Sequence, residues 1–173
     1  MSPVTDGFKD IDGGGDSGFE KSEFMLKLSW NTDLDAEIYQ QFDIKLGYAD
    51  EKSNETYLGL TRDDFDADPY RRYAASQLDN MQWDHQQIQL THNLEFNSGL
   101  TLHTDVYRNT YKRDWFKVNG FNTDTTSIQD VLKNPTSGNN PDFYNVLMGE
   151  AGSSTAAERI KIGNNGREYV SQG

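Results

Sequence analysis

Hydrophobic and polar residues alternate with a period of two along several stretches of the chain. In the segment FMLKLSW, Phe24, Leu26 and Leu28 fall on one side, while Met25 and Lys27 fall on the other. The same alternation returns in IYQQFDIKLGY, HQQIQLTHNLEF and LTLHTDVYR. Because successive side chains of a β-strand point to opposite faces, this pattern predicts strands. We expect four strands, near residues 23–31, 38–49, 84–97 and 99–116.

One face of the four predicted strands is apolar and the other is polar. The apolar positions hold no Asp, Glu, Lys or Arg, although Gln40 interrupts them in the second strand. Four such strands in series predict an antiparallel sheet with one face suited to nonpolar surroundings. The residues expected to face lipid are Phe24, Leu26, Leu28, Phe42, Ile44, Leu46, Ile88, Leu90, Leu94, Leu100, Leu102 and Val106.

The connections between the predicted strands alternate between short and long. Residues 31–37 and 97–99 form tight links, whereas the links 50–82 and 117–166 are far longer than usual. In an antiparallel sheet, both long links fall at the same end. Strands of about ten residues with short turns at one end and long loops at the other are typical of outer-membrane β-barrels.

Aromatic residues fall near both ends of the predicted strands. Trp30 and Phe96 lie beside the short turns, and Tyr48 and Trp83 lie near the long loops, where two interfacial girdles are expected. The alternative is a soluble β-sandwich, a carbohydrate- or calcium-binding module whose apolar face packs on a second layer, since sandwich strands also alternate. The sorting of loop lengths by end favours the barrel.

Composition and charge narrow the functional classes. The net charge of −12, from 16 basic and 28 acidic residues, disfavours nucleic acid as a partner, because nucleic-acid binding needs clustered Lys and Arg. With no cysteine, the chain can form neither a disulfide framework nor a thiolate metal site. The sequence also contains no apolar run of about 18 residues and begins with nothing like a signal peptide.

Three segments of the chain carry a resemblance to a known family. Residues 55–92, ETYLGLTRDDFDADPYRRYAASQLDNMQWDHQQIQLTH, resemble an extracellular loop and the following strand of TonB-dependent outer-membrane receptors of the ferric-citrate and ferric-siderophore type. The segment GFKDIDGGGDSGFEKSEFMLKLSW resembles an earlier loop and its strand, and REYVSQG resembles the start of the next strand.

The resemblance implies an all-β fold: an antiparallel meander of four long strands plus a partial fifth, part of a transmembrane β-barrel with long extracellular loops. Such barrels have about 22 strands and a separate plug domain. The implied cargo is a ferric chelate (iron-citrate or a siderophore), and the implied partners are outer-membrane lipid and, through the plug, the TonB complex. We expect residues 1–173 to be an internal barrel fragment without the plug, in the outer membrane of a Gram-negative bacterium.

The cluster PYRRYAAS supplies the candidate ligand-binding residues. Arg71 and Arg72 stand among tyrosines in an otherwise acidic chain, and Arg62 lies shortly before them. Guanidinium groups bind carboxylates through two parallel hydrogen bonds, so these arginines fit a polyanionic chelate. The alternative, which we favour, is salt bridging to the aspartates of the same loop, at positions 63, 64, 66 and 68.

No catalytic or metal-binding set emerges from the remaining polar residues. The acidic, glycine-rich stretch DIDGGGDSG lacks the ligand spacing of a calcium loop and is expected to be a loop. His92 falls on the apolar face and His103 on the polar face, so they cannot share a cation. No nucleophile, base and orienting group can be assembled, so we expect neither an enzyme nor a cofactor.

Short helical turns are expected inside the long loops. Thr61 is placed to cap a turn through Asp64, and Ser127 to cap IQDVLK before Pro135. The stretch DFYNVLMGEAG predicts a third turn ending at one of its glycines.

Overall fold

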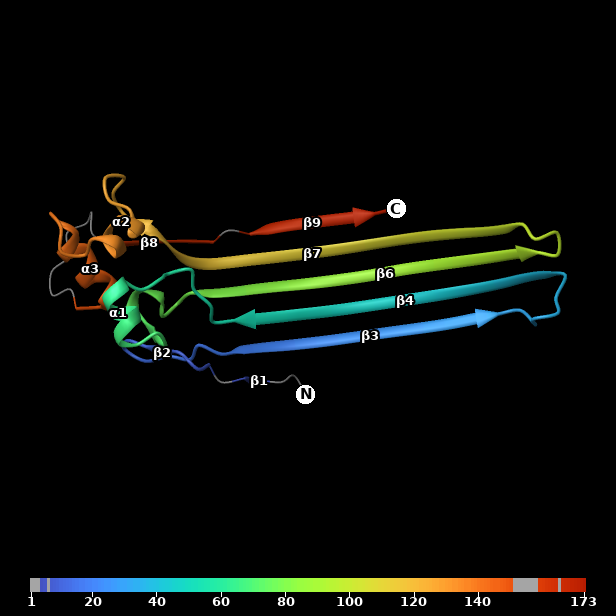
Figure 1. Ribbon diagram of the computed structural model, residues 1–173, viewed down its shortest axis with the longest axis horizontal. Helices are drawn as coiled ribbons and strands as arrows, with labels where there is room; N and C mark the ends of the chain where they lie inside the picture. The colour runs from blue at the N-terminus through green and yellow to red at the C-terminus, as the bar shows by residue number, and fades with distance from the viewer. Residues whose placement is uncertain (1–3, 6, 151–158, 165) are drawn as a thin grey trace. The chain divides into compact units, whose positions relative to one another are not determined.

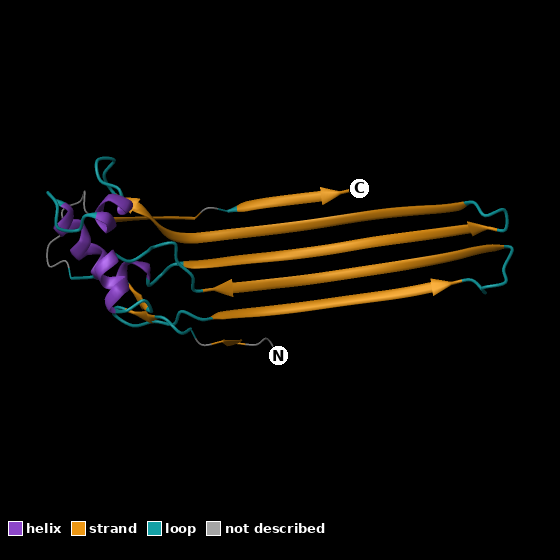
Figure 2. Ribbon diagram, in the orientation of Figure 1, coloured by secondary structure: helices purple, strands orange, loops and turns teal. Residues whose placement is uncertain are grey.

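The computed structural model describes residues 4–5, 7–150, 159–164 and 166–173, and these are mostly β (Figures 1 and 2). One seven-stranded sheet has the order β1-β3-β4-β6-β7-β8, and β9 also pairs with β7. The order confirms the antiparallel meander with a partial fifth strand, because REYVSQG forms β9. The strands of this sheet are β1 (Val4–Thr5), β3 (Phe19–Asn31), β4 (Ile38–Ser53), β6 (Asn80–Phe96), β7 (Thr101–Phe121), β8 (Ile160–Asn164) and β9 (Arg167–Gln172).

The four long strands extend further toward the long loops than the sequence pattern predicts. β3 begins at Phe19 rather than near residue 23, β4 continues to Ser53, β6 begins at Asn80, and β7 continues to Phe121. The predicted boundaries at these ends are therefore wrong. Charged runs such as DEKS and the Asn-Gly pair at 119–120 hide the extensions, since they interrupt the apolar alternation on which the prediction depends.

Three short strands, β2 (Asp10–Ile11), β5 (Arg71–Arg72) and β8, lie inside segments that the sequence predicts to be loops. β8 pairs antiparallel with the end of β7, and β2 pairs parallel with β5. The β2–β5 pair is reinforced by hydrogen bonds from the amides of Asp10 and Asp12 to the carbonyls of Tyr70 and Arg72, at 3.1 and 2.8 Å. Strands of two residues carry no periodicity, so their pairing depends on tertiary contacts alone.

All three predicted helical turns are present. α1 (Arg62–Ala67) begins after Thr61, whose side chain accepts a hydrogen bond from the amide of Asp64, and α2 (Ile128–Lys133) is capped in the same way by Ser127. α3 (Asn140–Met148) ends at Gly149, which has a positive φ of 80°. Side-chain acceptors at helix starts and a left-handed glycine at a helix end satisfy otherwise unpaired backbone groups. A 3₁₀ turn, η1 (Ala74–Ser76), follows β5.

The chain divides into two compact units. Unit 1 comprises residues 1–20, 52–82 and 114–166, and unit 2 comprises residues 21–51, 83–113 and 167–173. Unit 1 contains both long loops and holds a hydrophobic core of Tyr73, Phe121, Val131, Phe143 and Leu147. The described parts of these loops therefore enclose buried side chains of their own.

Unit 2 is a single layer of sheet with both short turns. None of its residues is buried. The second turn closes through a hydrogen bond of 2.8 Å from the amide of Gly99 to the carbonyl of Phe96, with Gly99 at a φ of 82° that favours glycine. The sheet does not close on itself within the described residues, since its order ends at β1 on one side and at β8 and β9 on the other.

The side chains of unit 2 confirm the predicted division into two faces, but the expectation that the apolar face holds no charged residue is wrong at Arg108 and Lys112, which share the parity of Leu102 and Val106 on β7. On the polar face, Asp43 accepts hydrogen bonds from Ser29 and Gln41, and Asp105 accepts one from Thr91 at 2.5 Å. The apolar face carries the twelve residues expected to face lipid; Phe42, Leu46 and Leu94 are half-buried and the other nine are exposed.

Replacing Leu147 by alanine should destabilise unit 1. Leu147 is 0% exposed, and loss of a buried leucine side chain costs about 2–5 kcal/mol of unfolding free energy. Leu78→Ala is the matched control, because Leu78 belongs to the same unit and is 66% exposed. Urea unfolding measures both. Equal losses for the two variants would contradict the assigned core.

Candidate functional site

Arg71 joins two loops of unit 1 through two carboxylates. Its guanidinium lies 3.0 Å from a carboxylate oxygen of Asp12 and 2.8 Å from one of Asp64. The β2–β5 pairing brings Asp12 beside Arg71, although 59 residues separate them in sequence. A hydrogen bond to Asp12 raises the pKa of Arg71, against the effect of burial. The side chains of Arg71, Asp12 and Asp64 are all partly shielded from water, which makes these two ion pairs stronger than fully exposed ones.

Asp64 is the centre of a larger cluster that we call the Asp64 cluster: Asp12, Thr61, Asp64, Arg71, Tyr73 and Tyr144. The hydroxyl groups of Thr61 and Tyr73 donate to one oxygen of Asp64, at 2.6 and 2.5 Å, and the Tyr144 hydroxyl donates to the same oxygen. Burial alone would raise the pKa of Asp64, but these hydrogen bonds and the Arg71 charge outweigh it and lower that pKa. The cluster therefore ties the residue that follows β2 to α1, β5 and α3 around one ionised carboxylate.

Arg72 points into the interior of unit 1 and is 4% exposed. It donates to the Ser76 carbonyl at 2.9 Å and to the Asn54 carbonyl at 2.5 Å. Asp79, 2% exposed, accepts from Thr56 at 2.6 Å and from the amide of Val118 at 2.9 Å. Burial lowers the pKa of Arg72 and raises that of Asp79, while the attraction between the two charges opposes both shifts.

A cavity of about 340 Å³ in unit 1 reaches Arg72. Lys9, Ser17, Asn54 and Glu55 contribute polar groups to its lining, and Phe8 and Phe19 contribute apolar surface. The cavity is large enough for a small molecule, and it presents two cations, Lys9 and Arg72, together with one carboxylate.

The three predicted binding residues do not converge on one site. Arg62 is exposed and pairs with Asp66 at 2.8 Å, one helical turn away. Arg71 is held by its two aspartates and Arg72 lines the cavity. Salt bridging to aspartates of the same loop is thus confirmed for Arg62 and Arg71. Binding of a ligand by any of the three stays a prediction.

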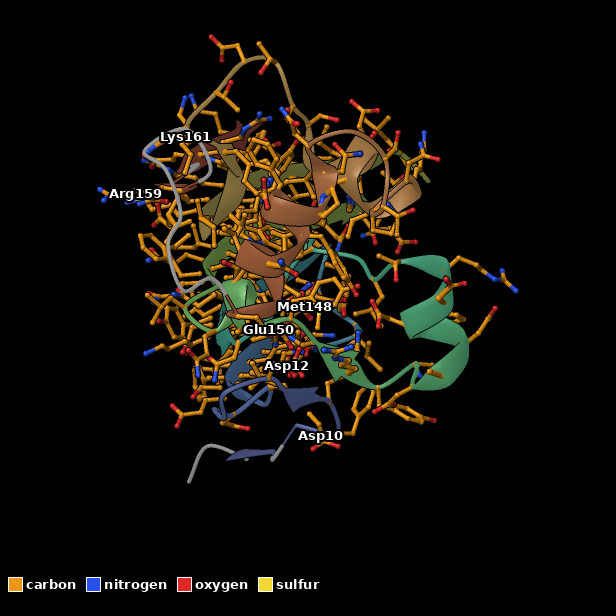
Figure 3. The ribbon with its side chains drawn as sticks, turned by 90° about the vertical axis from the view of Figure 1, so that its left-hand side faces the viewer. Asp10, Asp12, Met148, Glu150, Arg159 and Lys161 are labelled. Atoms are coloured by element: carbon orange, nitrogen blue, oxygen red, sulfur yellow. The ribbon has the colours of Figure 1, made fainter. Side chains whose placement is uncertain are left out.

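Asp12 and Asp79 are the polar partners that sequence reasoning missed. Asp12 lies in the glycine-rich stretch that was expected to be a loop, and part of that stretch is strand β2. Figure 3 shows Asp10 and Asp12 on this segment, and Arg159 and Lys161 at another edge of unit 1. No sequence signal links Asp12 to Arg71, because their contact follows from a two-residue strand pair.

An aromatic row lies on the polar face of unit 2. The rings of Trp83 and Tyr111 are 5.9 Å apart, those of Tyr111 and Tyr169 are 6.3 Å apart, and Lys21 lies over Trp83 at 5.9 Å. The predicted place of Trp83 in a lipid-facing girdle is therefore wrong. Its odd position puts it on the face opposite to Tyr48, because side chains alternate along each strand.

The histidines lie apart, as predicted. His92 stacks on Phe42 of the apolar face with ring centres 4.0 Å apart, while His103 contacts Asn93 and Asp105 of the polar face at 2.5 and 2.6 Å. Among the described residues, no group of three or more His, Cys, Asp and Glu side chains is arranged to hold a metal ion.

Comparison with known proteins identifies no relative: no family model, no curated protein and no solved structure matches the chain. In the part of the chain that the structure describes, no helix has the length and apolar character needed to cross a membrane.

Replacing Asp64 by asparagine should destabilise unit 1 most at neutral pH. The lowered pKa means that Asp64 stabilises the fold above its unfolded pKa of about 3.9, and that this contribution is lost as the pH falls through the lower folded value. Hydrogen bonds to a charged group contribute about 1.5–3 kcal/mol each, so we expect a loss of at least about 2 kcal/mol at pH 7. Urea unfolding at pH 7 and pH 2 measures it.

Asp63→Asn is the control for this experiment, because Asp63 is an exposed neighbour on α1. The raised pKa of Asp79 favours the folded state as the pH falls, and the effect is common to all variants. A destabilisation by Asp64→Asn that is as large at pH 2 as at pH 7 would contradict the role of the ionised carboxylate.

Proposed function

We propose that this chain forms a wall segment and outer loops of an outer-membrane β-barrel of the TonB-dependent receptor type, which takes up a ferric chelate. The apolar face of unit 2 carries the proposal. Its large side chains are open to solvent in the chain alone, with Phe24 61%, Ile88 53% and Val106 56% exposed. A contiguous apolar surface of this kind requires a nonpolar partner.

The opposite face suits the interior of a barrel. Its carboxylates Asp43 and Asp105 accept hydrogen bonds from hydroxyl groups of neighbouring strands, and Asp43 also accepts one from the side-chain amide of Gln41 on its own strand. Barrels of the outer membrane place apolar residues toward lipid and polar residues toward the lumen, alternating along each strand. In this arrangement the aromatic row of Trp83, Tyr111 and Tyr169 faces the lumen.

The sandwich alternative requires a second layer over the apolar face. Within the described residues no such layer exists, since no residue of unit 2 is buried. Lipid would cover this face without any further protein layer. Strand edges in lipid must be paired, so the proposal places further strands of a barrel beside β3 and β9.

The ordered loops of unit 1 supply the surface for capturing cargo. Both long links carry helices around a hydrophobic core, and the Asp64 cluster cross-links them. Loops held in one conformation lose less entropy when they bind a ligand. Arg62 has a side chain that is 83% exposed, and it is the predicted binding residue most open to a polyanionic ferric chelate.

A charge on the apolar face should block membrane assembly. We expect Ile44→Lys in the intact receptor to impair barrel assembly in liposomes, because a lysine at mid-bilayer costs about 2–4 kcal/mol. Lys45→Ile, its neighbour on the polar face, should fold with the yield of the wild type. Equal yields for the two variants, measured by the gel shift between unheated and boiled samples, would refute the facing assignment.

The receptor role predicts chelate binding by the membrane-assembled protein. Titration with ferric citrate should quench fluorescence of the three tryptophans with saturation, and Arg62→Gln should weaken binding about tenfold through loss of one charged contact. Lys133→Gln removes an exposed cation from α2 and serves as the control. Lack of saturable quenching by ferric citrate and by a hydroxamate siderophore would refute the receptor role.

A further inference from the structure

Arg108 departs from the rule that the apolar face carries no charge. β7 continues past Val106 without interruption, and β9 pairs with it in regular register from Arg108↔Gln172 to Arg113↔Arg167. Arg108 therefore shares the parity of Leu102 and Val106, and it lies on the apolar face.

Two hollows on this face meet at Arg108. One, of about 690 Å³, is lined by Ile88, Leu90 and Val106 together with Arg108. The other, of about 480 Å³, is lined by Leu46, Tyr48 and Ile88 together with Arg108. Arg108 and Ile88 belong to both, so a single guanidinium stands between two apolar depressions of unit 2.

The Arg108 side chain is exposed and has no hydrogen-bond or ion-pair partner among the residues that the structure describes. By contrast, Arg71 is held by Asp12 and Asp64. Lys112, four residues after Arg108 on the same face, pairs with Glu168 at 3.7 Å. An unpaired guanidinium beside apolar surface favours an anion that also brings apolar groups.

We propose that Arg108 binds the phosphate of an anionic membrane lipid, whose acyl chains cover Ile88, Leu90 and Val106. The inference depends on the proposed function, because it places the apolar face in a bilayer. Six residues separate Leu102 from Arg108, about 20 Å along a strand. The apolar band of an outer-membrane barrel is about 25 Å tall, so Arg108 falls near the headgroups when Leu102 lies near the other interface.

The attraction between Arg108 and a lipid phosphate is local, because the chain as a whole is acidic. At −12 the protein as a whole repels an anionic surface, so the attraction must come from direct contact between the lipid phosphate and the Arg108 guanidinium. On the face that carries Arg108, the paired stretch of β7 and β9 also holds Lys112, which pairs with Glu168. Arg113 and its register partner Arg167 have the opposite parity and fall on the polar face.

The test compares assembly of the intact receptor that contains this chain in two kinds of vesicle, phosphatidylcholine alone and phosphatidylcholine with phosphatidylglycerol. We expect the wild type to partition about fivefold more strongly into the anionic vesicles, the effect of one cation near a charged surface. Arg108→Gln should lose this preference while still assembling in phosphatidylcholine. Arg108→Lys, which keeps the charge, should retain part of it.

Lys45→Gln is the matched control, because it removes the same charge from the polar face of unit 2 and should keep the preference. An equal loss in Lys45→Gln, or an undiminished preference in Arg108→Gln, would overturn the site. If inorganic phosphate at constant ionic strength suppresses the preference, Arg108 binds free phosphate, and the proposal of a lipid ligand is wrong. Failure of the wild-type receptor that contains this chain to assemble in either vesicle would instead refute the membrane function.

Discussion

The uncovered apolar face of unit 2 is the constraint on which the rest of the structure depends. A sheet whose leucines, isoleucines and phenylalanines remain open on one side must bury them against something, since apolar surface in water costs about 25 cal/mol per Å². The described chain offers no second layer. The hydrogen-bonded carboxylates of the opposite face exclude that face from nonpolar surroundings, so the two faces demand two different environments.

Unit 1, by contrast, buries its apolar side chains against one another. Its hydrophobic side chains pack around Tyr73 and Leu147, and its charges are neutralised internally by Arg71 with Asp12 and Asp64, and by Arg72 near Asp79. Unit 1 thus has a buried hydrophobic core, as a small globular protein does, whereas unit 2 has none within the described residues. This contrast is the expected division between water-exposed loops and a lipid-exposed wall, which is the function we propose.

The parts of the fold that follow from local rules were predictable from the sequence. Alternation placed Ile44 and Lys45 on opposite faces, and capping chemistry placed the helices after Thr61 and Ser127. Prediction failed where pairing depends on distant partners: β2 with β5, β8 with β7, and Asp12 with Arg71. The position of Trp83 along its strand suggests a girdle residue, whereas its parity puts it on the polar face, in the aromatic row with Tyr111.

The most direct test of the account is a scan of β4 with single cysteines from residue 40 to residue 46, which the absence of native cysteine makes possible. Each variant would carry a polarity-sensitive fluorophore and be assembled in liposomes. The account predicts blue-shifted emission at positions 42, 44 and 46 and water-like emission at positions 41, 43 and 45. Uniform emission along the strand, or blue-shifted emission at the odd positions, would contradict a lipid-facing apolar surface.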